Sequence, residues 1–215
     1  MNYLSRKIIF FILIIHSLLL TPACKVSEET YAVRVANCLK NSEDLGLEFE
    51  VVETGQKGRP HIVKPACLLG AKLPEFELTD MNGNTINTNN IKGKINIINF
   101  WFIHCAPCVE EIPDLNTLVQ KYNRSDINFL AIVRDQPEQL QEFLKEHPFH
   151  FTILPNGTDV TENQFHLMWG YPFTLITDKE NRIIGAIRAG GAENRISESI
   201  IQKVEAILED YRVNK

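Results

Sequence analysis

The sequence predicts an α/β fold with a central mixed sheet flanked by helices. Two apolar runs, at 95–102 and 127–133, have the composition of buried strands, and each precedes a segment with helical spacing of its apolar residues. Strands that alternate with helices predict parallel strands joined by crossovers, with helices on both faces of the sheet. Two strands near the C-terminus, at 173–177 and 183–189, flank a short turn and predict an antiparallel edge to this sheet.

The other expected elements follow from similar patterns. Before the sheet, residues 74–78 and 85–87 flank a turn that contains Asn82 and Gly83, a pair typical of hairpins. A further short strand is expected at 149–154. Helices are expected at 107–122, 137–146, 159–168 and 197–211.

Length and charge limit the classes of protein to consider. The chain has 215 residues, enough for one domain of ordinary size and an appendage. Its net charge of −5, with no basic stripe along the sequence, argues against a nucleic-acid partner. We place the domain at 71–215 and a polar N-terminal extension at 24–70, where 47–52 and 62–63 predict a small hairpin.

Residues 1–23 have the pattern of a bacterial signal peptide. Arg6 and Lys7 precede an apolar run at 8–20, which is too short to span a membrane. The residues that follow end in Ala23 and Cys24 and resemble a lipobox, the site at which bacterial lipoproteins receive their lipid. The chain is therefore expected in the cell envelope, with a lipid anchor to a bacterial membrane, facing the periplasm or the cell surface.

The lipobox resemblance is incomplete, because Thr21 stands where a leucine is usual. Plain secretion and an uncleaved anchor are the alternatives, and both also place the domain outside the cytoplasm. Glu28 and Glu29, shortly after Cys24, resemble the surface-export signal of Bacteroidetes-type lipoproteins.

Cys105 and Cys108 form the most informative motif, at the junction between the buried strand and the helix after it. Two intervening residues allow the cysteines to close a small disulfide ring. The start of the helix directs free backbone N–H groups and the positive end of its dipole at Cys105, which favours the thiolate. A thiolate is the species that attacks disulfides, so the motif predicts redox chemistry. A zinc site is a weaker interpretation, because no second C-x-x-C supplies the missing ligands.

Cys38 and Cys67 remain after these assignments, and exported chains tend to pair their spare thiols. A disulfide between them would close a loop of about 30 residues and add about 3–4 kcal/mol of stability in the chain-entropy interpretation. The alternative is a second redox pair that relays electrons to Cys105 and Cys108. We favour the structural disulfide, because the two cysteines lie far apart in sequence and outside any predicted helix start.

Four features in order resemble the TlpA/ResA-like family of extracytoplasmic thiol–disulfide oxidoreductases, a thioredoxin-fold branch of the redoxin, AhpC/TSA-like superfamily. The resemblance runs from Leu73 to the C-terminus, about two thirds of the chain. The features are Leu-Pro-Glu-Phe at 73–76 before the Asn-Gly hairpin, Trp101 four residues before Cys105, Cys-Ala-Pro-Cys-Val-Glu-Glu-Ile-Pro at 105–113, and Gly-Tyr-Pro-Phe-Thr at 170–174 before a strand.

This resemblance implies a catalytic cycle. Cys105 would be the exposed nucleophile that forms a mixed disulfide with substrate, and Cys108 the more buried thiol that resolves it. Glu111, on the same helix face as Cys108, matches a family glutamate near the cysteines and could shuttle a proton to or from the second thiol. The alternative for Glu111 is an ordinary surface charge in the first turns of a helix.

The resemblance also implies a substrate-binding loop. Pro172 matches the family's cis-proline, whose loop lies opposite the cysteines and leaves the preceding backbone free to bind an extended substrate, so Tyr171 would shape substrate choice. We also assign Trp101 to this region, where it is expected to pack beneath the redox loop.

Three neighbours of the cysteines are expected to tune their redox properties. Ala106 and Pro107 lie between the cysteines, and this intervening pair sets the reduction potential in the family. His104 would lower the thiol pKa if it were protonated near the sulfur, and would have no effect if it were merely exposed.

The expected activity is protein-disulfide reduction, with exported thiol or disulfide proteins as substrates, a membrane electron donor as partner, and no cofactor beyond the cysteine pair. A thiol peroxidase is one alternative, but it needs a threonine three residues before the reactive cysteine, where Phe102 stands. A copper-binding module is another, with His104 or His166 as a nitrogen ligand. We expect no resident metal.

Overall fold

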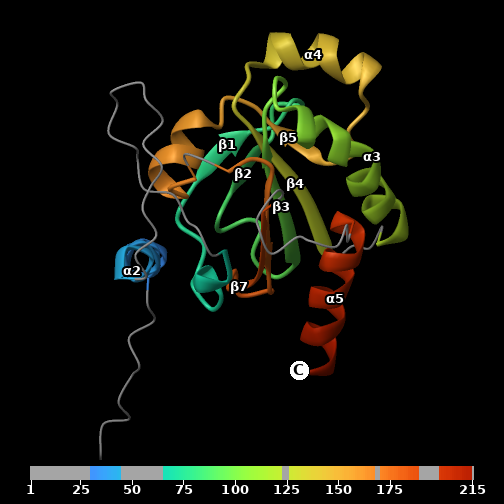
Figure 1. The fold of residues 1–215 in the computed structure, drawn as a ribbon. Helices are drawn as coiled ribbons and strands as arrows, with labels where there is room; N and C mark the ends of the chain where they lie inside the picture. Colours follow the sequence, from blue (N-terminus) through green and yellow to red (C-terminus); the bar gives the residue numbers. More distant parts are fainter. Residues whose placement is uncertain (1–29, 45–64, 123–125, 168–169, 189–198, 215) are drawn as a thin grey trace, which may run out of the picture.

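The structure is a computed structural model, and Figure 1 shows its fold. It describes residues 30–44, 65–122, 126–167, 170–188 and 199–214. The signal peptide, Cys24 and the expected hairpin at 47–63 lie outside these described residues. Within the described part of the chain, no helix is both long enough and apolar enough to cross a membrane.

A five-stranded mixed sheet forms the centre of the fold, with strand order β5-β4-β3-β6-β7. The first three strands in this order run parallel, and β6 and β7 are antiparallel to their neighbours, as the sequence predicts. The strands are β3 (Ile95–Trp101), β4 (Ile127–Val133), β5 (Thr152–Leu154), β6 (Phe173–Thr177) and β7 (Ile183–Arg188).

The expected hairpin precedes the sheet as β1 (Glu77–Thr79) and β2 (Thr85–Asn87). The Asp80 carboxylate closes its turn by accepting hydrogen bonds from the backbone N–H groups of Asn82 and Asn84, each at 2.8 Å. Gly83 has φ +86°, a conformation that glycine adopts readily.

Three helices pack their apolar stripes into one cluster with β3 and β4, and they lie on the right and at the top of the sheet in Figure 1. These are α3 (Ala106–Lys121), α4 (Pro137–Glu146) and α5 (Ile200–Val213). Their bounds agree with the expected helices to within about three residues at each end. Ser199 caps α5 by accepting a hydrogen bond from Gln202 N–H, which fixes where this helix begins.

The apolar cluster on the opposite face of the sheet includes an element that the sequence analysis did not predict. Helix α2 (Tyr31–Asp44) buries Tyr31, Val35 and Cys38, which recur at helical spacing on one side. A disulfide joins Cys38 to Cys67 in the short 3-10 helix η1 (Pro65–Leu68). The described part of the extension therefore belongs to the core of the fold.

The helix expected at 159–168 is shorter than predicted, because only residues 158–164 of the described chain are helical there. A single π-helical turn, η2 (Val160–Gln164), ends where Phe165 N–H donates to the Val160 carbonyl at 3.0 Å, and His166 then has φ +52°. The physical reason is the burial of Phe165, whose ring lies 4.9 Å from that of Phe100 and 5.8 Å from that of Tyr31, centroid to centroid. Phe165 therefore contacts both Tyr31 of α2 and Phe100 of β3.

A candidate redox site at the start of helix α3

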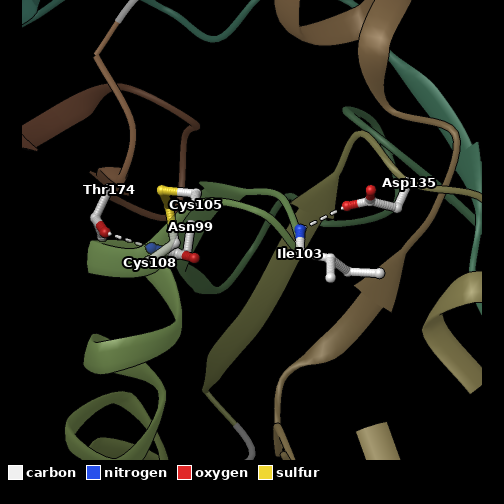
Figure 2. Close-up of a disulfide and its surroundings, with 6 residues drawn as sticks. All are labelled: Asn99, Ile103, Cys105, Cys108, Asp135 and Thr174. Atoms are coloured by element: carbon white, nitrogen blue, oxygen red, sulfur yellow. Dashed lines mark hydrogen bonds between the residues drawn. A yellow bond between two sulfur atoms is a disulfide. The ribbon is translucent and has the colours of Figure 1, made fainter. Parts of the chain in front are cut away.

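Cys105 and Cys108 are joined by a disulfide where β3 gives way to α3 (Figure 2). Cys105 is the N-cap residue of the helix, with extended backbone angles (φ −92°, ψ 93°). Its carbonyl accepts hydrogen bonds from Cys108 N–H at 2.9 Å and Val109 N–H at 3.1 Å. The pair therefore lies between the end of a fully buried strand and the first turn of a helix with one buried face.

The electrostatics of this helix start favour a negative charge on sulfur. Free backbone N–H groups and the positive end of the helix dipole gather there, and the first turn of α3 contains no acidic residue. Pro107 lies within the first turn, where the missing N–H group costs no helical hydrogen bond, and both Ala106 and Pro107 are exposed.

The expectation of an exposed Cys105 is wrong for the disulfide form. Cys105 is only 6% exposed, against 2% for Cys108, so both cysteines are buried and Cys105 is slightly the more accessible. The two belong to one apolar cluster, against which the partly buried side chains of Phe102, Ile103 and Tyr171 pack. A thiol that attacks this disulfide can therefore reach only the small exposed part of Cys105.

Three hydrogen bonds fix the loop that carries Cys105. Ile103 N–H donates to Asp135 Oδ2 at 2.8 Å, as Figure 2 shows. Cys105 N–H donates to the Phe102 carbonyl at 3.1 Å, and Arg134 N–H donates to the Trp101 carbonyl at 3.3 Å. Residues just after β4 thus hold the end of β3 and the redox loop in place.

A buried, uncharged polar pair lies in the sheet beside the disulfide (Figure 2). Asn99 on β3 and Thr174 on β6 are register partners, and Asn99 Nδ2 donates to Thr174 Oγ1 at 3.0 Å. Because both side chains are buried, this hydrogen bond offsets the cost of desolvating them.

Glu111 lies one helical turn after Cys108 on α3 and is half-buried. Burial raises the pKa of this carboxyl from its ordinary value of 4.5 to about 7, Lys203 on α5 opposes the shift, and Asp114 adds to it. A carboxyl with a pKa near neutrality can both accept and release a proton at physiological pH.

The loop expected to bind substrate lies against the redox loop. The bond between Tyr171 and Pro172 is cis. The Tyr171 ring meets the Phe102 ring edge to face, with centroids 5.2 Å apart and an interplanar angle of 90°. These contacts bring together two segments of the predicted site that are about 70 residues apart in sequence.

Trp101 packs inside the core next to the redox loop, as expected, and is too buried to belong to the substrate-binding residues. Trp101 is 1% exposed and packs against the rings of Phe143 and Phe149, so it supports the redox loop from within the core. His104 is exposed at the edge of the loop. No cluster of three or more metal-ligating side chains occurs in the part of the chain that the structure describes, so the copper alternative gains no support.

The second disulfide is separated from the first by the sheet. Cys38 belongs to the apolar cluster on the α2 face, whereas Cys105 and Cys108 belong to the cluster on the α3 face. Thiol–disulfide exchange requires direct contact between sulfurs, so this arrangement disfavours a relay between the two pairs.

Arg134, which follows β4, is a site residue that sequence reasoning missed. Its guanidinium carbon lies 5.7 Å from the ring centroid of Phe102 and 5.9 Å from that of Tyr171. Its Nη2 also lies 3.1 Å from Glu162 Oε1. The only sequence signal was its position directly after a buried strand, at the sheet edge where the redox loop begins.

Comparisons with known proteins identify the family and the fold of this chain. Residues 69–197 match the AhpC/TSA family. Thiol-disulfide oxidoreductase ResA from a strain of Bacillus cereus is 27% identical over 143 residues, which cover 66% of this chain and 81% of that protein. ResA from Geobacillus kaustophilus is 28% identical over 121 residues, which cover 56% of this chain and 69% of that protein.

A solved structure has the same fold over the same part of the chain. The thioredoxin domain of a thiol-disulfide oxidoreductase from Bacteroides vulgatus aligns with a TM-score of 0.54 at 20% identity, over 64% of this chain and 96% of that one. The family match covers well over half of the sequence, and the fold is thioredoxin-like, as expected. The chain thus belongs to the AhpC/TSA family, among its TlpA/ResA-like thiol–disulfide oxidoreductases.

Proposed function

We propose that this protein reduces disulfide bonds in exported proteins outside the cytoplasm, using Cys105 and Cys108 as its redox centre. The observation that carries the proposal is the placement of this cysteine pair at the first turn of α3, beside the loop of Tyr171 and Pro172. That placement provides thiolate stabilisation and an adjacent surface for a polypeptide.

The cycle begins with the reduced dithiol. The Cys105 thiolate attacks one sulfur of the substrate disulfide, which forms a mixed disulfide and releases the other sulfur as a thiolate that takes up a proton. The Cys108 thiolate then attacks the Cys105 sulfur, closes the internal disulfide and releases the second substrate thiol. Two electrons pass from the protein to the substrate, which leaves as a dithiol.

Glu111 serves the second step as a proton acceptor. Cys108 is buried, and burial in apolar surroundings disfavours its thiolate. A half-buried carboxylate with a pKa near 7 can take the Cys108 proton as that sulfur attacks, and can release it to solvent afterwards.

The proposal includes a location in the cell envelope and a membrane protein as electron donor. The signal-peptide pattern and the lipobox resemblance at Cys24 support a lipid-anchored protein of the cell envelope. The oxidised cysteine pair must then be reduced again, and a dithiol protein in the membrane is the proposed donor. Labelling with a radioactive fatty acid tests the anchor, and Cys24→Ser should abolish the label.

The decisive experiment is the equilibrium reduction potential of the cysteine pair, measured against glutathione in a soluble form that begins after Cys24. A value near that of thioredoxin, about −270 mV, is expected for a reductase. A value near that of DsbA, about −120 mV, would instead identify a protein that makes disulfides. Rapid peroxide consumption by the same protein would favour the thiol peroxidase.

A further inference from the structure

We propose that Arg134 binds a carboxylate of the substrate polypeptide next to its disulfide, so that the enzyme prefers substrates with an acidic residue at this position. This inference rests on the proposed reductase function and names the substrate class of the same site. The observation that carries it is the convergence of four segments beside Cys105 into one small platform. The platform consists of Phe102, Arg134, Glu162 and Tyr171.

The platform is continuous with the redox loop. Phe102 lies three residues before Cys105, and its carbonyl accepts the Cys105 N–H at 3.1 Å. Tyr171 directly precedes Pro172, and its ring contacts the Phe102 ring edge to face. A polypeptide whose disulfide reaches Cys105 must therefore pass within contact distance of these two rings.

The rings hold the guanidinium of Arg134 in a fixed orientation. Its carbon lies less than 6 Å from both ring centroids, at 5.7 Å and 5.9 Å, which is the range of a cation–π contact. The Arg134 backbone is also fixed, because its N–H donates to Trp101 at 3.3 Å and its carbonyl accepts from Thr158 Oγ1 at 3.4 Å. A held guanidinium loses little side-chain entropy when it binds a ligand.

The guanidinium also remains accessible. The side chain of Arg134 is 37% exposed and that of Glu162 is 27% exposed. The hydrogen bond between them joins Nη2 to Oε1 and engages one corner of the guanidinium fork. A carboxylate is the group that matches the whole fork with two parallel hydrogen bonds, so a substrate carboxylate can displace Glu162 from an exposed ion pair at little cost.

Glu162 then acts as an internal competitor for Arg134. It neutralises the guanidinium in the free enzyme, which reduces binding of unrelated anions, and it yields to a carboxylate that the disulfide has brought close. Removal of this competitor should therefore strengthen the acidic preference, whereas removal of Arg134 should abolish it.

The test measures kcat/KM for three peptides, each closed by one intramolecular disulfide, with Asp, Asn or Lys next to a cysteine. The wild-type protein should reduce the Asp peptide about fivefold faster than the Asn peptide, with the Lys peptide slowest. Arg134→Gln should bring the Asp/Asn ratio close to one, mainly through KM. Glu162→Gln should increase it, and added salt should decrease it in the wild type.

Arg212→Gln is the matched control, because Arg212 makes the same kind of contact, 5.7 Å from the Tyr122 ring centroid, at the far end of α5. This variant removes the same charge and should keep the wild-type ratio. An Asp/Asn ratio of one in the wild type, or a ratio that Arg134→Gln leaves unchanged, would overturn the inference. If the wild type reduces none of the peptides, or Cys105→Ser still reduces them, the proposed function itself fails.

Discussion

The two disulfides of this protein are chemically identical bonds in opposite settings. Cys105 and Cys108 are 3 residues apart at the mouth of a helix, whereas Cys38 and Cys67 are 29 residues apart and join α2 to η1. The first lies in the cluster on the α3 face of the sheet, and Cys38 lies in the cluster on the α2 face. Surroundings and loop length are therefore the basis on which we propose that the first bond is catalytic and the second a structural brace.

Loop length separates the two bonds energetically. Closing a loop of about 30 residues restricts the unfolded chain about twice as much as closing one of four, so the longer disulfide should contribute most of the disulfide stabilisation. The short bond contributes less to stability, which suits a bond that opens and closes in each cycle.

The largest expected effect comes from Cys105→Ser. Loss of the nucleophile should reduce the turnover of protein disulfides by at least about 10³-fold. The folded state should lose about 2 kcal/mol of stability, about half of what the longer disulfide contributes, because only the short ring is opened. Insulin reduction followed by turbidity measures the activity, and urea unfolding measures the stability. Retention of turnover would mean that another cysteine carries the reaction.

The second largest effect is expected on stability rather than on activity, and it comes from the other disulfide. Replacing both Cys38 and Cys67 by alanine should lower the free energy of unfolding by about 3–4 kcal/mol, because the unfolded chain regains its freedom. Urea unfolding under oxidising conditions measures this loss. Turnover by the folded fraction should stay at the wild-type level. A selective loss of turnover in this double variant would revive the relay alternative and contradict the division of roles.

The sequence predicted the region around Cys105 and Cys108 better than the region around Cys38 and Cys67. Strands β3 and β4 and helix α4 were predicted because long buried apolar runs and clear helical spacing leave few alternatives. The candidate redox cysteines, Cys105 and Cys108, could be located from the sequence because they form a local motif. The Cys38–Cys67 pairing could be favoured only by elimination, since a long-range contact has no local signal.

The missed features depend on tertiary contacts. Helix α2 lies in the extension that its composition marks as polar, and its buried residues Tyr31 and Cys38 find their partners, Phe165 and Cys67, only through long-range contacts. The helix expected at 159–168 ends early, in a π-helical turn directly before the buried Phe165. Arg134 and Glu162 meet the redox loop only in space.

Glu111→Gln tests the proposed proton transfer from Cys108 to Glu111, a step that only the proposed redox disulfide requires. At pH 7 this change should lower turnover by about 10²-fold, because general acid–base catalysis is lost. Wild-type turnover should rise with pH through an inflection near 7, where the Glu111 carboxyl loses its proton, and the variant should lack this inflection. A pH–rate profile between pH 5 and 9 checks both statements. Glu110→Gln, an exposed neighbour on α3, is the matched control.

The same variant should alter the pH dependence of stability. Burial raises the folded-state pKa of Glu111 from 4.5 to about 7, so between these values the folded protein keeps a proton that the unfolded chain has released. Stability therefore falls as pH rises through this window, and Glu111→Gln removes that loss. Relative to wild type, the variant should gain about 1–2 kcal/mol between pH 4 and pH 8, after a discount for partial exposure. A gain independent of pH would contradict the assignment.

The smallest expected effect comes from Tyr31→Phe, which tests how α2 is attached to the rest of the fold. The Tyr31 hydroxyl donates to the Phe165 carbonyl at 2.9 Å, so α2 is held to the η2 segment by a hydrogen bond as well as by the disulfide. Tyr31→Phe should cost about 1 kcal/mol, measured by urea unfolding, because the buried carbonyl loses its donor. Loss of the Cys38–Cys67 bond should not enlarge this cost if α2 remains docked through its apolar face. If α2 instead detaches without the brace, Tyr31→Phe will have no effect in the double-alanine background. The coupling energy is the difference between the effect of Tyr31→Phe in the wild type and its effect in the double-alanine variant. A value near zero means that α2 stays docked without the disulfide, and a value of about 1 kcal/mol means that the disulfide alone holds α2 in place.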